Sequence, residues 1–339
     1  MIVDRYYYNQ LNKNEQIIYR CFYKGIMDRK DIIPIPVKGM MTQEVFNRIF
    51  EAMTRDNPLI YYLNQSTCSL ATDVLGHTAI CPQYFFSRER IHEYNRKIEK
   101  VVNELAADLK LKEGTEYEKE LKVHDWLCNF VSYDYDGADI NDPVRFMEAH
   151  NIVGVFAHHR AQCEGIAKAV KVLLNAVDIK CIVVTGKADG NGQNGPHAWN
   201  IVNIDGKAYQ LDITWDIGAG GKNKDRMAYD YFNLTDGMMY MDHTPDSKLP
   251  ICNSLDMNYF RNNKLVFNSK TRLLAYIDSL LKKGEMDFYF QLEGRLKMKD
   301  ILKDISDLSM SVMTTQGKRN VRIQHIPNEK LGICWVRIK

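Results

Sequence analysis

The apolar residues that follow Cys163 have the spacing of one buried helix face. They recur at i, i+3, i+4, i+7 and i+8, and they are Ile166, Ala169, Val170, Leu173, Leu174 and Val177. Cys163 lies one turn before Ile166 on the same stripe. The pattern therefore predicts a helix that begins at this cysteine and directs its side chain inward.

Two alternating segments further along predict a β-hairpin. His197–Ile204 and Lys207–Trp215 alternate between apolar and polar residues, and Asp205-Gly206 between them favours a two-residue type I′ turn. A turn centred there pairs Ile204 with Lys207 and, by counting back, His197 with Thr214. The expected core face carries Ala198, Val202, Ile204, Tyr209, Leu211, Ile213 and Trp215; the opposite face carries His197, Trp199, Asp212, Thr214 and Asp216.

The other elements of the first 260 residues are mostly helical. Ser87 supplies an N-cap, and Thr115 with Glu118 forms a capping box. Helices are expected at Glu15–Lys24, Thr42–Arg55, Ser87 to about Leu111 and Thr115 to about Val131, with a helical turn at Phe146–Ala149. Strands are expected at Leu59–Leu63, Tyr84–Phe86, Ile179–Thr185 and Tyr229–Leu234. The Gly- and Asn-rich segment Lys187–Pro196 is expected to be a mobile lip that carries His197.

The last part of the chain predicts a separate module. Its pattern gives β-α-β-α-β-β, an order that suggests an α/β sandwich with partly parallel strand pairing. The elements are Lys264–Phe267, Ser269–Lys283, Met286–Leu292, Met298–Met313, Asn320–His325 and Gly332–Ile338. No motif links this module to chemistry, so substrate presentation, oligomer contact and a scaffold role all stay open.

A chain of 339 residues is long enough for two or three cores. We expect an α+β fold with a mainly helical N-terminal region at 1–95, a central domain at 96–260 and a small α/β domain at 261–339.

Composition and charge indicate which classes of partner and which cellular compartment to expect. The 45 basic and 43 acidic residues give a net charge of +2, so charge gives no reason to expect a nucleic acid or an anionic membrane as partner. The start of the chain does not resemble a signal peptide, and no apolar run reaches the roughly 20 residues of a membrane span. The eight cysteines include no C-x-x-C pair, which favours reduced thiols. We expect a soluble cytoplasmic protein, and its oligomeric state is open.

The residue types around the central helix are those of nucleophilic catalysis. A cysteine at a helix N-terminus meets unpaired N–H groups and the positive end of the helix dipole, which favour the attacking thiolate. On the hairpin, Asp212 lies diagonally from His197 and could hold the imidazole in one tautomer. Asp216 lies on the other diagonal, so it stays an alternative, although its neighbouring Gly218–Gly221 loop favours solvent exposure. Taken singly, Cys163 is better explained as a small buried thiol, and His197 as a hydrogen-bonded histidine at a strand end.

Taken together, these segments resemble the transglutaminase-like superfamily of papain-type folds, in its bacterial form. The resemblance rests on Cys163-Glu164-Gly165-Ile166-Ala167 and on HAWNIVNIDGKAYQLDITWD, His197 to Asp216, and it extends to Glu118–Asp136 and Tyr231–Thr244. Ile166 departs from the pattern, because an aromatic residue is commoner there. The resemblance implies a papain-like core in which a cysteine-bearing helix packs on an antiparallel sheet, with the Tyr133-Asp134-Tyr135 segment near the site.

The resulting hypothesis is a cysteine-dependent acyl-transfer enzyme acting on peptide or side-chain amides. Cys163 attacks, His197 moves the proton and Asp212 orients His197. Hydrolysis is preferred over protein cross-linking, since water is always present, and the expected partner is a protein or peptide substrate. The alternative from another class is a catalytically silent binding module on the same fold. A thiol-disulfide role is disfavoured because no resolving cysteine is evident.

Several neighbouring residues stay outside the predicted site. The Cys163 backbone N–H is expected to bind the oxyanion, whereas adjacent Gln162 is expected to point elsewhere and the second donor is unassigned. His124 is interpreted as structural, and His243 is left out because a surface or packing role is at least as good an explanation. His158 and His159 with Cys163 supply too few ligands for a zinc site. We expect no metal and no cofactor.

Overall fold

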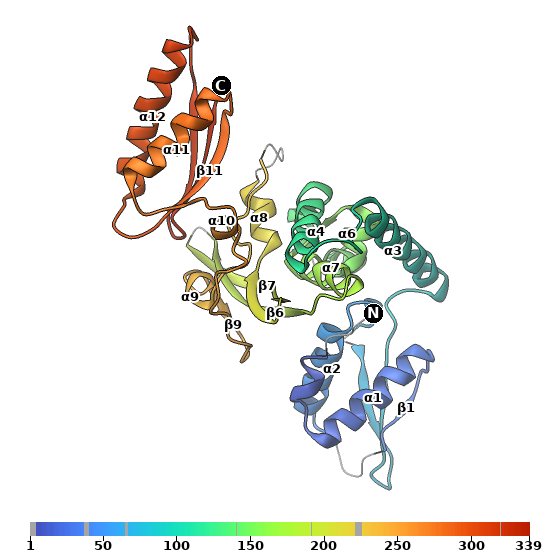
Figure 1. The fold of residues 1–339 in the computed structure, drawn as a ribbon. Helices are drawn as coiled ribbons and strands as arrows, with labels where there is room; N and C mark the ends of the chain where they lie inside the picture. Colours follow the sequence, from blue (N-terminus) through green and yellow to red (C-terminus); the bar gives the residue numbers. More distant parts are fainter. Residues whose placement is uncertain are drawn as a thin grey trace.

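The structure is a computed structural model that describes residues 5–36, 41–64, 67–139, 141–190, 192–220, 226–318 and 320–339. Figure 1 shows an N-terminal region and a C-terminal module with a central part between them. The hydroxyl of Tyr7 donates to the Val183 carbonyl at 2.6 Å, which ties the N-terminal region to the central sheet. Among the described residues, no helix combines the length and apolar character that crossing a bilayer requires.

The N-terminal region combines two helices with a small sheet. Helices α1 (Lys13–Met27) and α2 (Gln43–Asp56) cover both predicted helical segments. The strands β1 (Ile33–Pro34), β2 (Ser69–Thr72) and β3 (Thr78–Cys81) pair antiparallel in the order β1-β3-β2. The prediction of strands at 59–63 and 84–86 was wrong, because these segments form no regular strand and share an isolated bridge between Leu63 and Tyr84. The hairpin of β2 and β3 escaped prediction because β2 is mostly exposed and lacks a buried alternating face.

The helices α3 to α6 lie between the N-terminal region and the cysteine-bearing helix in the sequence. α3 (Arg88–Asp108) begins after its N-cap Ser87, as predicted. α4 (Glu116–Phe130) begins after its N-cap Thr115, which forms the predicted capping box with Glu118. The shorter α5 (Pro143–Ala149) and α6 (Ile152–His158) follow. The expected boundary between residues 95 and 96 falls inside α3, and buried apolar residues on both sides of it form one continuous core. The division of the chain into three domains stays a prediction.

The central part packs helix α7 (Cys163–Ala176) on an antiparallel sheet, as the α+β expectation requires. The sheet has the order β8-β7-β6-β9, and its strands are β6 (Cys181–Gly190), β7 (Gln193–Ile204), β8 (Lys207–Leu211) and β9 (His243–Pro245). Asp205 and Gly206 have positive φ angles of 49° and 80°, and Ile204 pairs with Lys207. The predicted helix start, hairpin turn and register are therefore confirmed.

The hairpin is shorter at its far end than predicted. β8 ends at Leu211, which pairs with Asn200, and the chain then forms α8 (Ile213–Ala219). The expected pairing of His197 with Thr214 is wrong for this reason. Asp212 is the N-cap of α8 and its carboxylate accepts a hydrogen bond from the Trp215 N–H, so local capping chemistry ends the strand.

Two other expectations about this sheet were also wrong. The segment 187–196 is the regular outer end of the paired strands β6 and β7. Lys187 pairs with Pro196 and Gly190 with Gln193, and Asn191 at the tip lies outside the described residues. The segment 229–234 is not a strand and makes one isolated bridge, from Leu234 to Gln210. Glycine content indicated an irregular loop in the first case, but glycine is also tolerated where strands pair closely.

The C-terminal module has the predicted order of elements. It comprises β10 (Val266–Phe267), α11 (Lys270–Lys282), β11 (Asp287–Leu292), α12 (Met298–Thr315), β12 (Ile323–Asn328) and β13 (Ile333–Ile338). The sheet order is β10-β11-β13-β12, with β10 and β11 parallel and the other pairs antiparallel. Both helices pack into a separate apolar core. At its edge, Asn328 donates to the Asp230 carboxylate of the central part at 3.1 Å.

Candidate active site

The N-terminus of α7 places Cys163 between helix and sheet. The half-buried thiol packs against Ala167, Val183 and Ala198. Gly165 makes this placement possible, because a Cβ there would lie 2.5 Å from the Ala149 carbonyl oxygen. The N-cap residue, Gln162, makes no side-chain cap hydrogen bond to the first turn. The helix therefore presents its N-terminal N–H groups at the cysteine without a side-chain acceptor from its own cap.

His197 and Asp212 meet as the sequence predicted, although by another route. His197 Nε2 lies 2.6 Å from Asp212 Oδ2, and Asp212 reaches it from the N-cap of α8 rather than from a strand. Cys163 lies close enough to the imidazole to contribute to the raised pKa of His197. Because Nε2 faces the carboxylate, Nδ1 is the ring nitrogen left for the thiol. The structure thus brings the three predicted side chains together.

Asp216, the alternative carboxylate, belongs to a different cluster. Its Oδ2 lies 3.1 Å from His124 Nε2, and its Oδ1 accepts the Tyr231 N–H at 2.9 Å. Asp216 is 1% exposed, so the expectation of solvent exposure was wrong. His124 is fully buried and also faces Asp125 at 2.9 Å and Cys128 at 3.6 Å.

The charges around His197 favour its protonated form. Burial alone would lower the pKa of His197, but the Asp212 carboxylate, followed by Cys163, outweighs burial and raises this pKa to about 10. Burial would likewise raise the pKa of Asp212, yet His197 and then His243 hold that pKa well below its usual range. An imidazolium beside a thiol stabilises the thiolate, which is the nucleophilic form.

The structure adds His243, which the sequence analysis left outside the site. His243 lies on β9 and is 1% exposed. Its Nε2 lies 3.0 Å from Asp212 Oδ2, the same oxygen that faces His197, and its Nδ1 lies 2.7 Å from Asp242 Oδ1. Gly186 permits this approach, because a side chain there would collide with the Thr244 carbonyl. Only the resemblance of the Tyr231–Thr244 segment pointed toward this residue.

A cleft of about 860 Å³ opens at His197. Its walls include Tyr133, Tyr135, Trp215 and Tyr231, together with residues 326–330 of the C-terminal module. Trp215, expected in the core, is instead partly exposed in this wall. Cys163 and Ile166 are not among the lining residues, and Ile166 is 1% exposed. The unusual residue at 166 therefore does not shape this cleft.

Gln162 is held away from the reacting groups, as expected. Its Oε1 accepts from the Tyr133 hydroxyl at 2.6 Å, and its Nε2 donates to the Asp134 carbonyl. Both ends of the amide therefore have partners outside the group of Cys163, His197 and Asp212. The contact instead fixes Tyr133 in the wall of the cleft.

The residues considered for a metal site separate in the structure. His158 faces Glu148 at 3.1 Å, and the His159 ring packs on Phe130. Within the described ranges, His197, Asp212 and His243 form the one group whose possible ligand atoms lie within 4.8 Å of one another. Both Nε2 atoms lie at hydrogen-bond distance from one carboxylate oxygen, so protons account for this arrangement.

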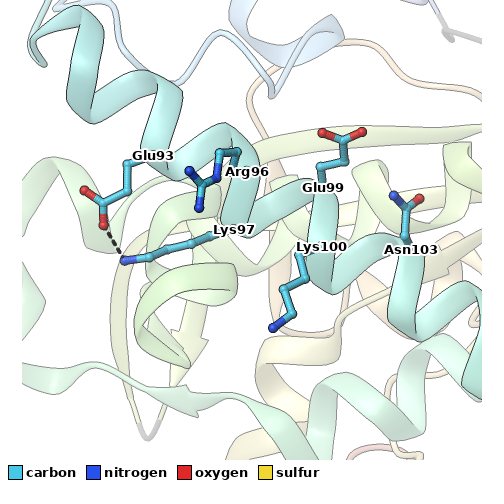
Figure 2. Close-up of a pocket in the computed structure, with 6 residues that line it drawn as sticks. All are labelled: Glu93, Arg96, Lys97, Glu99, Lys100 and Asn103. Carbon is cyan, nitrogen blue, oxygen red and sulfur yellow. Dashed lines mark ion pairs between the residues drawn. The ribbon is translucent and has the colours of Figure 1, made fainter.

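A second hollow, on the outer face of α3, has none of these features. Figure 2 shows its six lining residues, all on α3 and all exposed: Glu93, Arg96, Lys97, Glu99, Lys100 and Asn103. Glu93 and Lys97 form an ion pair at 2.8 Å. A charged, solvated helix face explains these residues without a ligand.

Comparisons with known proteins find similarity in the central part of the chain. Residues 103–212 match the model of the Transglutaminase-like superfamily. Kyphoscoliosis peptidase from Mus musculus and from Homo sapiens are each 25% identical over 159 residues, which is 43% of this chain and 23% of theirs. The match thus spans about a quarter of the length of these relatives. A solved structure described as a TGase is 19% identical over 54% of this chain and 50% of that chain, with a TM-score of 0.31.

The matched segment contains Cys163 and His197 and ends at Asp212. It also contains α7, which carries Cys163, and β7, which carries His197. Residues 103–212 of this chain therefore belong to the transglutaminase-like superfamily.

Proposed function

We propose that this protein is a cysteine-dependent acyl-transfer enzyme that acts on amide carbonyls through Cys163, His197 and Asp212. The observation that carries the proposal is the 2.6 Å contact between His197 Nε2 and Asp212 Oδ2, with Cys163 close enough to the same imidazole to raise its pKa. Activated cysteine nucleophiles have this arrangement, in which a third group orients the base.

The reaction follows from the positions of these groups. The Cys163 thiolate attacks the carbonyl carbon, and the C=O electron pair moves to the oxygen, which the N–H groups at the start of α7 stabilise. His197 then donates its proton to the leaving nitrogen as the C–N bond breaks, leaving a thioester. A water molecule gives a proton to His197 and attacks the thioester, and the C–S bond breaks to release the acid and the thiolate.

A peptide or protein substrate suits the open, partly aromatic cleft. Tyr133, Tyr135 and Trp215 offer flat apolar surface close to His197, and extended chains bind along such walls through side chains and backbone. Hydrolysis is the preferred outcome over protein cross-linking, because water reaches an open cleft of this size. None of the eight cysteines, all within the described residues, forms a disulfide, which supports a reducing compartment such as the cytoplasm.

The main rival is a binding module that keeps the fold without catalysis. Its cleft would need no poised thiol, so the rate at which Cys163 reacts with iodoacetamide separates the two functions. In an enzyme, Cys163 alkylation is already fast at neutral pH. A profile that rises only around the ordinary thiol value of about 8.5 would favour the binding module.

The direct test combines a thiol-reactive activity probe with a panel of peptide and glutamine-donor substrates. We expect wild-type protein to be labelled at Cys163 and to release product, and Cys163→Ala to lose both while keeping its unfolding temperature. Retained turnover in Cys163→Ala would remove the assignment. Product analysis with and without an added primary amine distinguishes hydrolysis from amine transfer.

A further inference from the structure

His243 lies between two carboxylates in the interior of the central part. Its Nε2 is 3.0 Å from Asp212 Oδ2, its Nδ1 is 2.7 Å from Asp242 Oδ1, and its side chain is 0% exposed. An ionised carboxylate accepts hydrogen bonds and cannot donate them. Both ring nitrogens therefore carry a proton, and His243 is an imidazolium.

The carboxylate of Asp242 is in turn surrounded by donors. Besides His243, it accepts from the Tyr231 hydroxyl at 2.9 Å and lies 3.5 Å from the ammonium of Lys330. Lys330 belongs to the turn between β12 and β13, in the C-terminal module. Charges therefore alternate from His197 through Asp212, His243 and Asp242 to Lys330, across two parts of the molecule.

We propose that His243, held by Asp242, is a positioning residue of the active site that fixes the Asp212 carboxylate against His197. This inference rests on the proposed function. Asp212 Oδ1 is held by the Trp215 N–H at 3.1 Å, and His243 supplies the second donor that fixes Oδ2. A carboxylate held at both oxygens keeps its orientation while His197 gains and loses a proton.

The position of His243 sets its electrostatic effect on His197. The two rings are 5.3 Å apart between centroids, and the other groups that face His243 are Asp212, Asp242 and the rings of Trp199, Trp215 and Tyr231. A cation at this distance opposes protonation of His197 and offsets part of the attraction from Asp212. Removing that cation therefore makes the His197 imidazolium persist to higher pH.

The test compares His243→Gln with wild type, because the glutamine amide retains a donor near Asp212 and removes the charge. We expect kcat to fall about 10- to 100-fold, as for loss of other partners that orient a reacting group. KM should stay within about twofold, since His243 does not line the cleft. Alkylation of Cys163 by iodoacetate, an anion that the His197 imidazolium attracts, should stay fast to a pH about one unit higher than in wild type. The ratio of the rate at pH 10 to the rate at pH 8 should therefore rise.

His124→Gln is the matched control. His124 is equally buried between two carboxylates, at 2.9 Å from Asp125 and 3.1 Å from Asp216, but belongs to the other cluster. The His124→Gln variant should be less stable than wild type, and its ratio of Cys163 alkylation rates should equal that of wild type. Should His243→Gln fail to fold, Lys330→Met, at a half-exposed position, should move the same ratio in the same direction by a smaller amount.

The outcomes separate this inference from the proposed function. Wild-type kcat and an unchanged rate ratio in folded His243→Gln would overturn the positioning role while leaving the enzyme intact. An equal change of the ratio in His124→Gln would also overturn it, since a general loss of packing would then suffice. Absence of turnover in the wild type would remove the proposed function, and the alkylation ratio would still test the coupling of His243 to His197.

Discussion

Two sets of cysteine, histidine and aspartate lie in the central part, and they use the same residue types differently. Cys163, His197 and Asp212 meet beside an open cleft. Cys128, His124 and Asp216 meet in the interior, where each residue is 7% exposed or less. The two aspartates are only one helical turn apart, at the N-cap of α8 and within it.

Helix position and solvent access distinguish the two cysteines. Cys163 is the first residue of α7, where N–H groups face the thiol, whereas Cys128 lies in the last turn of α4, near the negative end of the helix. Burial raises the pKa of the Cys128 thiol, although His124 acts against this. Residue identity alone therefore does not make a nucleophile, and the surroundings decide which thiol reacts.

The largest expected difference between the clusters is in thiol reactivity. Limited iodoacetamide at pH 7 should modify Cys163 at least about 1000-fold faster than Cys128, because the latter is buried in its protonated form. Peptide mass spectrometry of the native protein gives both rates, and denatured protein provides the control in which the two converge. Comparable native rates would remove the distinction between the two clusters.

The next expected difference concerns the two aspartates. Asp212→Asn should lower kcat at least about 100-fold, since an asparagine has one oxygen where Asp212 uses two and thus offers His197 the wrong partner. The kcat values of Asp212→Asn and Asp216→Asn are compared per folded molecule, with the folded fraction of each variant measured by unfolding. A larger kcat loss at 216 than at 212 would contradict the assignment of Asp212.

Asp216→Asn tests the same substitution in the buried cluster. Asp216 also uses both oxygens, one for the Tyr231 N–H and one for His124, so the variant leaves one buried donor unpaired. We expect a loss of about 1–3 kcal/mol in the free energy of unfolding. Activity per folded molecule should stay within about threefold of wild type, because both carboxylate oxygens of Asp216 hydrogen bond to groups other than Cys163 and His197.

Local patterns predicted the parts of this site that depend on a few neighbouring residues. The apolar stripe after Cys163 located the helix start, and Asp205-Gly206 located the turn and its register. The contact between His197 and Asp212 was predicted from a strand diagonal, yet it forms because Asp212 caps a helix. The prediction reached the right pair through the wrong local structure.

Tertiary contacts account for what the sequence did not predict. His243 reaches Asp212 only because β9 pairs with β6 at the edge of the sheet. Lys330 approaches Asp242 from the C-terminal module, which has its own core. No short-range pattern encodes such approaches. The same applies to Asp216, whose burial against α4 contradicted the exposure that the neighbouring glycines had indicated.

The last expected effect is a pH dependence of stability that arises beside the buried cluster. Glu120 lies one turn before His124 on α4, is 1% exposed and accepts from Asn233 Nδ2 at 2.7 Å. Burial raises the pKa of Glu120 from 4.5 to about 8. The folded protein therefore binds this proton more tightly than the unfolded chain does. The stability from this group is complete below about pH 4.5 and is lost as the pH rises through 8.

Glu120→Gln removes this titration, because a glutamine oxygen can still accept from Asn233 without carrying a charge. We expect the variant and the wild type to unfold at similar urea concentrations at pH 5. At pH 9 the variant should be more stable by on the order of 2 kcal/mol, and Glu113→Gln, at an exposed position, should match wild type at both pH values. If the free energies of unfolding of wild type and Glu120→Gln changed in parallel with pH, Glu120 would keep its charge in the interior. The buried cluster would then tolerate charge as well as the cleft does.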